Sequence, residues 1–396
     1  MAWRQRRDST QGSGVTQRIG ITGANGFVGG WVTRRLAQDP SCDIVTIDRT
    51  AWNDPDRLCR LAGECDTIIH LAGVNRGDAA DVESQNLALA AQLTAACRRA
   101  GVTPHLIYSS TTKRDEDSPY GRGKLRAEQT FAAWAEETGA SVTTLVIPNV
   151  YGAGCRPFYN SVVSTFCHQL THGERPTIVE DRVVEFVWVG DLAERIAQIA
   201  AAPQPGSAVT LPVHGSAELR ITELLELLEG FRSDYFDRDV VPDLTTQLRS
   251  TLYTTFLSYV ALADHVHRPP LHSDSRGDLC EVIKTVAGGQ VFFSTTQPGV
   301  TRGNHYHTRK AEWFCVVRGE ATIRLRKIGG AEVTEFTVAG NQPQFVSIPV
   351  LHTHSIENTG DAELLTLFWC NELFDPSDAD TFYEDVLPPV ATRHAA

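Results

Sequence analysis

The segment Thr22–Gly29, which reads Thr-Gly-Ala-Asn-Gly-Phe-Val-Gly, decides the fold of the first part of the chain. It follows the apolar run Arg18–Thr22 and opens a helical pattern at Gly29–Ala37. In such a strand–turn–helix unit the first glycine permits the turn, the second lets the backbone approach a pyrophosphate, and the third lets helix and strand pack closely. The helix N-terminus then faces the phosphates. The cofactor-binding residues expected in this segment are Gly23, Asn25, Gly26, Phe27, Val28 and Gly29.

Downstream of this turn, short apolar runs alternate with helical patterns such as Gln85–Ala100. Continuous apolar strands separated by helices indicate a parallel sheet covered on both faces. We therefore predict an α/β Rossmann-type doubly wound parallel sheet within residues 17–262. The later strands expected in this sheet are Asp43–Ile47, Asp66–Leu71, Pro104–Ser109 and Val142–Ile147.

The character of the chain changes after a proline- and serine-containing stretch at residues 263–276, which is typical of a linker. Short strand-like runs then recur with turn residues between them, which predicts an all-β barrel or jelly roll at 277–390. Residues 1–16 are expected to be a disordered leader, because no apolar segment follows their arginines. The strands expected in the barrel are Val291–Ser294, Trp313–Val317, Ala321–Arg326, Phe345–Ile348 and Leu364–Trp369.

Composition limits the classes of partner. The net charge is −12, from 36 basic and 48 acidic residues, which argues against nucleic acid or an anionic membrane as a partner. No apolar stretch approaches the length of a membrane span. The nine cysteines contain no Cys-x-x-Cys pair and are expected to be reduced thiols. We therefore expect a cytoplasmic protein of two domains.

Asp48 ends the second expected strand, about twenty residues beyond the glycines, where a carboxylate binds the ribose hydroxyls of NAD. Arg49 follows directly and could instead pair with the 2′-phosphate of NADP. Asp48 favours NADH and Arg49 favours NADPH, so the choice stays open.

A second group of polar residues lies after the fourth strand, where Ser110 and Thr111 precede Tyr120 and Lys124. Positions 120 and 124 lie on one face of a helix. A lysine ammonium there is expected to lower the phenol pKa, so that tyrosine exchanges a proton with a sugar oxygen during hydride transfer. A hydroxyl from Thr111, or from Ser110, would bind the same oxygen.

A third group has the spacing of a metal site. His305 and His307 project to one face of a strand, and Glu312 and His354 can complete a cluster from neighbouring strands. Imidazoles and a carboxylate suit Zn²⁺ or another divalent transition metal. Such a metal could be catalytic, or it could only brace the barrel.

The first part resembles the extended short-chain dehydrogenase/reductase (SDR) family in its glycine motif, in His70–Gly73, in the Tyr120/Lys124 pair with Thr111, in Pro148–Gly152 and in Glu185–Asp191. Members that dehydrate nucleotide sugars carry Asp-Glu after the catalytic threonine, whereas Thr112-Lys113 stand here, which disfavours dehydration. The resemblance adds further cofactor-binding positions, which are Leu71, Ala72, Gly73, Lys124 and Pro148.

The second part resembles the cupin family from Gly299 to Gly319 and again through Pro349, His354 and Asn358, departing at Leu351, where glycine is usual. Nearly the whole chain resembles the CapF-type family of bifunctional capsular polysaccharide synthesis enzymes, a reductase–cupin fusion. The segments that carry this resemblance are His70–Arg76, Tyr159–Val162, Arg302–His305 and Asn371–Pro376.

The CapF-type resemblance implies a function. In that family the cupin epimerises C3 of a UDP-2-acetamido-2,6-dideoxy-4-keto-hexose, and the reductase then reduces C4 with NADPH, giving UDP-2-acetamido-2,6-dideoxy-L-talose on the way to N-acetyl-L-fucosamine. A homodimer is expected. The general base is left open among Glu281, Lys284 and Tyr306. The implied substrate-binding residues are Asn75, Arg76, Asn149, Tyr159 and Asn160.

Two alternatives remain. In one, the chain is a monofunctional 4-keto nucleotide-sugar reductase whose cupin serves only for structure or oligomerisation. In the other, it is a dinucleotide sensor without catalysis, against which the intact Thr111, Tyr120 and Lys124 argue.

Overall fold

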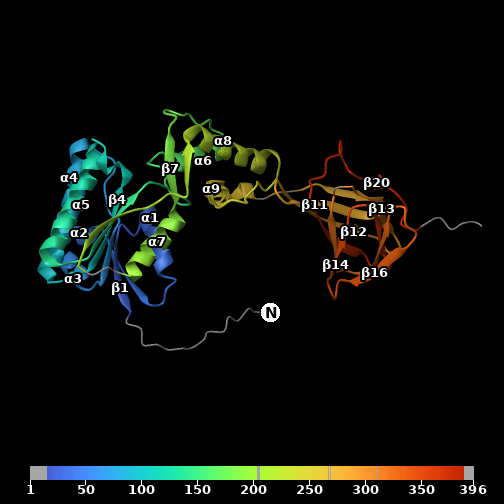
Figure 1. Ribbon diagram of the computed structural model, residues 1–396, viewed down its shortest axis with the longest axis horizontal. Coiled ribbons are helices and arrows are strands. Elements are labelled where there is room, and N and C mark those ends of the chain that lie inside the picture. The colour runs from blue at the N-terminus through green and yellow to red at the C-terminus, as the bar shows by residue number, and fades with distance from the viewer. Residues whose placement is uncertain (1–15, 203–205, 266, 268, 309, 388–396) are drawn as a thin grey trace, which may run out of the picture. The chain divides into compact units, whose positions relative to one another are not determined.

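The computed structural model describes residues 16–387, except 203–205, 266, 268 and 309. The chain divides into two compact units, one within residues 1–226 and 254–259 and the other within 227–253 and 260–396 (Figure 1). The leader predicted at 1–16 and the last residues of the predicted 277–390 domain fall mainly outside the described residues. The predicted boundary at 262 stays a prediction.

A six-stranded parallel sheet forms the centre of the first unit, in the order β2-β1-β3-β4-β5-β8 (Figure 1). This confirms the predicted Rossmann-type sheet. The five sequence-predicted strands all form, and β8 extends the sheet at one edge. The strands are β1 Gln17–Thr22, β2 Cys42–Ile47, β3 Thr67–His70, β4 His105–Thr111, β5 Val142–Ile147 and β8 Ala208–Pro212.

Helices cover both faces of this sheet because neighbouring strand residues point to opposite sides. Ile68 packs with α3, α4 and α5, whereas Ile69 packs with α1 and α7. Leu106 and Ile107 alternate in the same way. The helices are α1 Phe27–Leu36, α2 Arg49–Trp52, α3 Pro55–Gly63, α4 Ala79–Ala100, α5 Pro119–Thr138 and α7 Val189–Ala201.

Beyond β5 the chain builds a smaller region from a three-stranded sheet and further helices. The sheet has the order β6-β7-β9. Its elements and those that follow are β6 Asn149–Tyr151, α6 Val162–Thr171, β7 Val183–Trp188, β9 Ala217–Arg220, α8 Ile221–Arg232, η2 Ser233–Asp237, α9 Gln247–Leu257 and η3 Leu262–His265. Among the described residues, no helix is both long and apolar enough to cross a bilayer.

Two antiparallel sheets face each other in the second unit, with the orders β10-β11-β12-β19-β14-β17 and β16-β15-β18-β13-β20. This confirms the predicted barrel. Phe314, Ile323, Ile356 and Phe368 belong to the apolar core between the sheets. The strands are β10 Leu271–Asp274, β11 Gly277–Thr285, β12 Gly289–Thr296, β13 Thr301–Tyr306, β14 Glu312–Arg318, β15 Glu320–Lys327, β16 Val333–Ala339, β17 Phe345–Ile348, β18 His352–Asn358, β19 Leu364–Cys370 and β20 Phe382–Tyr383.

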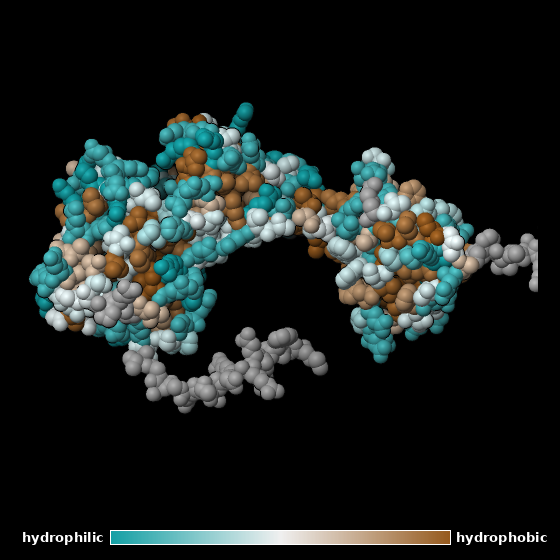
Figure 2. All heavy atoms as spheres, viewed as in Figure 1, coloured by the Kyte–Doolittle hydropathy of each residue, from teal (hydrophilic) through white to brown (hydrophobic). Residues whose placement is uncertain are grey.

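Two features of the second unit were not predicted from the sequence. Strand β10 lies within the stretch interpreted as a linker and pairs with β11. Pro269 and Pro270 precede this strand and led to the linker interpretation, whereas the pairing with β11 depends on a neighbouring segment. Apolar side chains also reach the surface, as Figure 2 shows, and Trp313, Val317 and Phe345 are among the exposed ones.

Candidate functional sites

The glycine turn has the backbone geometry that the sequence predicted. Gly23 has a φ of 70°, a conformation that favours glycine, and its carbonyl oxygen accepts a hydrogen bond from the Gly26 backbone N–H at 2.9 Å. A Cβ atom on Gly29 would lie 2.0 Å from that same oxygen. Helix α1 therefore packs against the turn only with glycine there, and its N-terminus at Phe27 is left beside the turn. This cradle suits a dinucleotide pyrophosphate.

At the end of β2, Asp48 is the N-cap of α2. Its Oδ1 accepts hydrogen bonds from the backbone N–H groups of Thr50 and Ala51, both at 3.1 Å. The hydrogen bond from the Thr50 hydroxyl is the main reason that the pKa of Asp48 lies below its usual value. Oδ2 lies 3.5 Å from Arg57 Nη2. Sequence reasoning missed Arg57, which adds a cation beside Asp48, where the cofactor ribose is expected, while Arg49 is exposed.

The helix that carries Tyr120 and Lys124 begins where the sequence contains a capping serine and a proline. The Ser118 hydroxyl accepts a hydrogen bond from the Gly121 N–H at 3.0 Å, and Pro119 opens α5. Tyr120 and Lys124 then lie one turn apart. Thr111, the last residue of β4, hydrogen-bonds the Tyr120 side chain. The structure therefore brings together the three residues that the sequence predicted to act on one oxygen.

The electrostatics of this trio differ from the prediction in one respect. Burial raises the pKa of Tyr120 above its ordinary value, and the hydrogen bond from Thr111 only partly opposes the rise. Lys124 Nζ lies 6.0 Å from the Tyr120 ring centroid and donates to the Ser109 carbonyl oxygen at 2.7 Å. The expected lowering of the phenol pKa by Lys124 is therefore wrong for the chain by itself. Burial also lowers the pKa of Lys124, to about 8.

Ser110 does not join the trio. Its hydroxyl is buried and donates to Glu128 Oε2 at 3.3 Å, and Glu128 in turn pairs with Arg114 at 2.6 Å. Neighbouring residues of a strand point to opposite faces. Since Thr111 bonds Tyr120, Thr111 is the hydroxyl positioned for the reacting oxygen, and Ser110 is not.

The segment after β3 lies beside the lysine. A Cβ atom on Gly73 would lie 3.4 Å from Lys124 Nζ, so Gly73 lets the chain pass the ammonium closely. Asn86 of α4 holds this segment: its side chain accepts from Val74 N at 3.2 Å and donates to Val74 O at 2.6 Å. Sequence reasoning missed Asn86, although a buried amide in an otherwise apolar helix face is a signal.

Four of the five predicted substrate-binding residues meet one another. The Tyr159 hydroxyl donates to Asn75 Oδ1 at 2.5 Å, Arg76 Nε donates to Asn160 Oδ1 at 3.3 Å, and the Arg76 guanidinium lies 4.8 Å from the Tyr159 ring centroid. Asn149 lies apart from these hydrogen bonds among the described residues, on β6, where it pairs with Phe186 of β7. The four form a polar wall from two loops that are distant in sequence.

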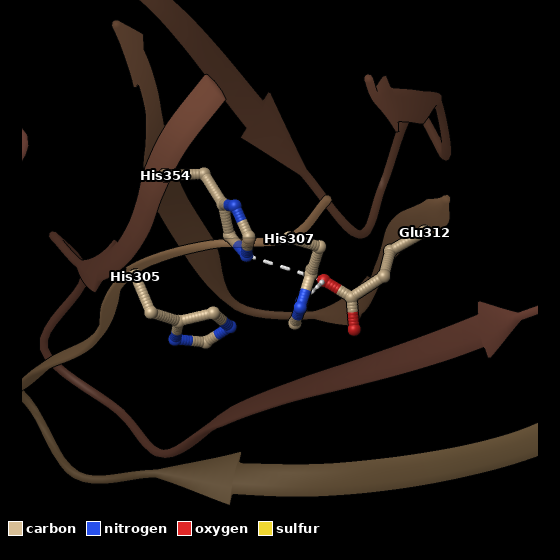
Figure 3. Close-up of side chains that lie close together, drawn as sticks. All are labelled: His305, His307, Glu312 and His354. Atoms are coloured by element: carbon tan, nitrogen blue, oxygen red, sulfur yellow. Dashed lines mark hydrogen bonds and ion pairs between the residues drawn. The ribbon is translucent and has the colours of Figure 1, made fainter. Parts of the chain in front are cut away.

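The predicted metal ligands come together within the barrel. One ligand atom each from His305, His307, Glu312 and His354 lies within 4.8 Å of the other three. Figure 3 shows these side chains pointing toward one another. His305 comes from β13, Glu312 opens β14 and His354 comes from β18, which pairs with β13 through His305 and His354.

Hydrogen bonds fix the orientation of two of these rings. His307 Nδ1 donates to the Asp380 carbonyl oxygen at 2.5 Å, and His354 Nδ1 donates to the His352 carbonyl oxygen at 3.2 Å. Each Nε2 atom therefore points at the cluster, and both lie 3.2 Å from Glu312 Oε2. His354 Nε2 is buried, and within the described part of the chain its 3.2 Å approach to Glu312 Oε2 does not have hydrogen-bond geometry. A buried imidazole nitrogen held in this way beside a carboxylate fits a metal ligand.

The protonation of the cluster favours a cation. Burial would raise the pKa of Glu312, but the hydrogen bond from His307 and the His354 imidazole 3.2 Å away lower it to about 2. Burial lowers the pKa of His305 to about 4. Near neutral pH the site therefore holds one carboxylate and at least one neutral imidazole, which is the donor set that a divalent transition metal needs.

The register of the barrel separates the three candidate bases. Tyr306 lies between His305 and His307, so it points away from the cluster, and it stacks on Phe382 at 5.3 Å. Glu281 pairs across strands with Phe292, which packs against the core. Lys284 pairs with the buried Gln290, in the cross-strand row that continues through Cys370 to Glu312. Glu281 and Lys284 thus share the inner face with the cluster, and Tyr306 does not.

Comparison with known proteins identifies a matching family for each of the two parts of the chain. Residues 19–210 match the NAD dependent epimerase/dehydratase family, and residues 272–382 match the polysaccharide biosynthesis C-terminal domain. The chain is 33% identical over 373 residues, 92% of this chain and 98% of the relative, to UDP-2-acetamido-2,6-beta-L-arabino-hexul-4-ose reductase of Pseudomonas aeruginosa. The chain belongs to the CapF-type family.

Solved structures agree with this assignment. Capsular polysaccharide assembling protein CapF from Staphylococcus aureus matches with a TM-score of 0.82 and 33% identity, covering 93% of this chain and 100% of that chain. UDP-glucose 4-epimerase of Thermotoga maritima matches 61% of this chain and 98% of its own at 20% identity and a TM-score of 0.52, which shows the fold alone. The protein is therefore an NAD(P)-dependent oxidoreductase of the extended SDR family joined to a cupin-type barrel.

Proposed function

We propose that this enzyme carries out two consecutive reactions on a UDP-linked 4-keto sugar. The barrel inverts C3 of a UDP-2-acetamido-2,6-dideoxy-4-keto-hexose, and the SDR unit then reduces the C4 ketone, giving UDP-2-acetamido-2,6-dideoxy-L-talose for the N-acetyl-L-fucosamine pathway. The observation that carries the proposal is the convergence of Thr111, Tyr120 and Lys124 beside the glycine cradle. The names of the relatives support the substrate class.

In the reduction, Tyr120 gives its phenol proton to the C4 oxygen, and the Thr111 hydroxyl hydrogen-bonds the same oxygen. The raised pKa of Tyr120 keeps the phenol protonated at neutral pH, as a proton donor must be. NADPH or NADH, when bound in the cradle, supplies the hydride. Lys124 holds a positive charge near the forming alcohol, and its hydrogen bond to Ser109 fixes the position of that charge.

In the epimerisation, the C4 ketone makes the hydrogen on C3 acidic. A base removes this hydrogen and a proton returns to the other face of C3. Zn²⁺ or another divalent metal held by His305, His307, Glu312 and His354 would act as a Lewis acid toward the ketone. Glu281 or Lys284 would serve as the base, because both lie on the inner face of the barrel.

The substrate would contact the polar wall of the SDR unit. Asn75, Arg76, Tyr159 and Asn160 present amide, guanidinium and phenol groups, which suit sugar hydroxyls and a diphosphate. Asn149 would contribute from β6. Cofactor choice rests on a balance in which Asp48 opposes a 2′-phosphate, whereas Arg49 and Arg57 attract it.

The test uses the full chain with the 4-keto substrate in D₂O without a nicotinamide cofactor. The proposal predicts deuterium at C3 under these conditions, and the talose product only after NADPH or NADH is added. Mass and NMR analysis of the products distinguishes the two steps. Reduction of the ketone without any C3 exchange would leave only the reductase.

That outcome is the second candidate, a monofunctional 4-keto reductase with a bracing cupin. The contacts of Glu312 with His307 and His354 support this candidate, since such buried contacts can stabilise a barrel that catalyses no reaction. Retention of C3 hydrogen in D₂O, together with normal C4 reduction, would favour it.

A further inference from the structure

The last described residues contact the strands that carry the predicted metal ligands. Residues 379–386, here called the C-terminal strap, include β20, which pairs with β13 through His305↔Tyr383 and Tyr306↔Phe382. The Thr353 hydroxyl, next to His354, donates to the Glu384 carbonyl oxygen. The strap therefore contacts the strands that supply two of the four ligands.

Asp380 is the strap residue that contacts the connection between the other two ligands, His307 and Glu312. It is 6% exposed, and its carboxylate accepts hydrogen bonds from Thr308 N at 3.1 Å and from Lys310 N at 3.0 Å. The Thr308 hydroxyl also donates to it, at 2.5 Å. Lys310 Nζ returns a hydrogen bond to the Ala379 carbonyl oxygen at 2.7 Å.

The backbone of Asp380 acts on a ligand directly. Its carbonyl oxygen accepts the hydrogen bond from His307 Nδ1, which leaves Nε2, the atom beside Glu312, as the ring atom that can bind an ion. Asp380 has a φ of 44°, a conformation that costs a non-glycine residue free energy. The side-chain hydrogen bonds hold the residue in this conformation, which aims its carbonyl at the ring.

The far end of the strap is anchored separately. Arg326 of β15 is 9% exposed, donates from Nε to the Val386 carbonyl oxygen at 2.9 Å, and pairs with Glu384 at 2.8 Å. The C-terminal strap is therefore fixed at both ends. Thr308 and Lys310, which lie between His307 and Glu312 in the sequence, contact its Asp380 end.

We propose that Asp380 is a positioning residue for the metal site. Its carboxylate holds the backbone N–H groups of Thr308 and Lys310, which lie between His307 and Glu312 in the sequence, and its carbonyl fixes the His307 ring before the ion binds. The inference rests on the proposed metal centre. Groups that orient ligands in this way typically change metal affinity about 10–100-fold when removed.

The test compares Asp380→Asn with Asp375→Asn in the full chain. The Asp380 variant is nearly isosteric but loses the charge and presents an NH₂ group to backbone N–H donors. Asp375 is an exposed aspartate a few residues earlier, whose carboxylate accepts hydrogen bonds from the backbone N–H and the hydroxyl of the nearby Ser377. Zn²⁺ affinity is measured by competition with a chromogenic chelator, and the Co²⁺ absorption spectrum reports ligand geometry.

We expect Asp380→Asn to weaken Zn²⁺ binding about 10–100-fold and to shift the Co²⁺ spectrum, and Asp375→Asn to do neither. If Asp380→Asn does not fold, Thr308→Val removes one hydrogen bond to the same carboxylate and should weaken binding several-fold. A folded Asp380 variant, or in its place a folded Thr308 variant, with parental affinity and spectrum would overturn the inference. Failure of the parental protein to bind Zn²⁺ would instead overturn the metal centre itself.

Discussion

Lys124 Nζ lies 2.7 Å from the carbonyl oxygen of Ser109 and 6.0 Å from the ring centroid of Tyr120. The ammonium is thus fixed by the backbone of β4 and acts on the reacting oxygen only at a distance. Burial lowers the pKa of Lys124 and raises that of Tyr120, so Lys124 loses its proton at a lower pH than Tyr120 does. This separation makes the roles of the two residues distinguishable by experiment.

Tyr120→Phe removes the phenol hydroxyl, which is the proton donor, and keeps the aromatic ring. We expect ketone reduction to fall about 10²–10⁴-fold, because general acid catalysis contributes that much in the transition state. NADPH affinity, measured by quenching of protein fluorescence, should stay near parental. Turnover close to that of the parental enzyme would contradict the reductase assignment.

The pH profile should report Lys124. Its pKa is lowered to about 8, so the ammonium is lost as pH rises through that value, while the phenol of Tyr120 stays protonated. The kcat/KM for reduction should therefore fall above about pH 8. Lys124→Arg should move this fall in kcat/KM to higher pH, because guanidinium keeps its proton. If the fall stays at the same pH in Lys124→Arg, it belongs to another group.

The lowered pKa of Lys124 also makes the free energy of unfolding depend on pH. In the folded chain Lys124 loses its proton near pH 8, whereas the unfolded chain keeps it until near the ordinary value of 10.5. Between these values the unfolded state binds more protons, so the contribution of Lys124 to the free energy of unfolding rises with pH. Lys124→Met should abolish that contribution in urea titrations at a series of pH values.

Asp48→Ala should shift preference toward NADPH. The change removes a carboxylate that repels a 2′-phosphate and frees Arg57 from its partner 3.5 Å away. It should also cost about 1 kcal/mol of stability, because the N-cap of α2 is lost. Arg57→Gln is the matched control and should shift preference the other way. An NADPH/NADH ratio that neither variant moves would show that this pair does not face the ribose.

Gly29→Ala and Gly30→Ala form a matched pair in the first helix. A Cβ on Gly29 would meet the Gly23 carbonyl oxygen at 2.0 Å, whereas a Cβ on Gly30 would meet the Arg34 side chain at 3.6 Å and the Ala24 carbonyl oxygen at 3.8 Å, both ordinary van der Waals contacts. Gly29→Ala should destabilise the fold by about 1–3 kcal/mol and weaken cofactor binding. Gly30→Ala should do neither. Equal thermal unfolding midpoints for the two variants would contradict the close packing.

Local patterns predicted much of this molecule. The glycine turn, the apolar runs of the parallel sheet and the His-x-His spacing each depend on neighbouring residues, and the structure contains the elements that they predict. Long-range contacts were not predictable in this way. Arg57 reaches Asp48 from another helix, and Asp380 meets Thr308 across a separation of 72 residues. Ser110 and Thr111 look equivalent in sequence, and only the direction of each side chain from β4 separates them.

The final prediction concerns independence of the two reactions. His305→Ala combined with Glu312→Gln removes two of the four predicted ligands and should abolish both Zn²⁺ binding and C3 exchange. Cofactor binding and the Tyr120–Lys124 pair should be unaffected, because they belong to a unit with its own apolar cores. Overall product formation should fall and should recover when a ketone already epimerised at C3 is supplied.

Metal loss could also unfold the barrel, since metal binding can supply folding free energy. Circular dichroism of the double variant therefore accompanies the assay, and Glu363→Gln, which removes a partly exposed carboxylate paired with Arg318 on the same unit, serves as the control. A folded, metal-free double variant that exchanges the C3 hydrogen at the parental rate would take the metal out of the reaction. The cluster would then be a brace, and the base alone would have to invert C3.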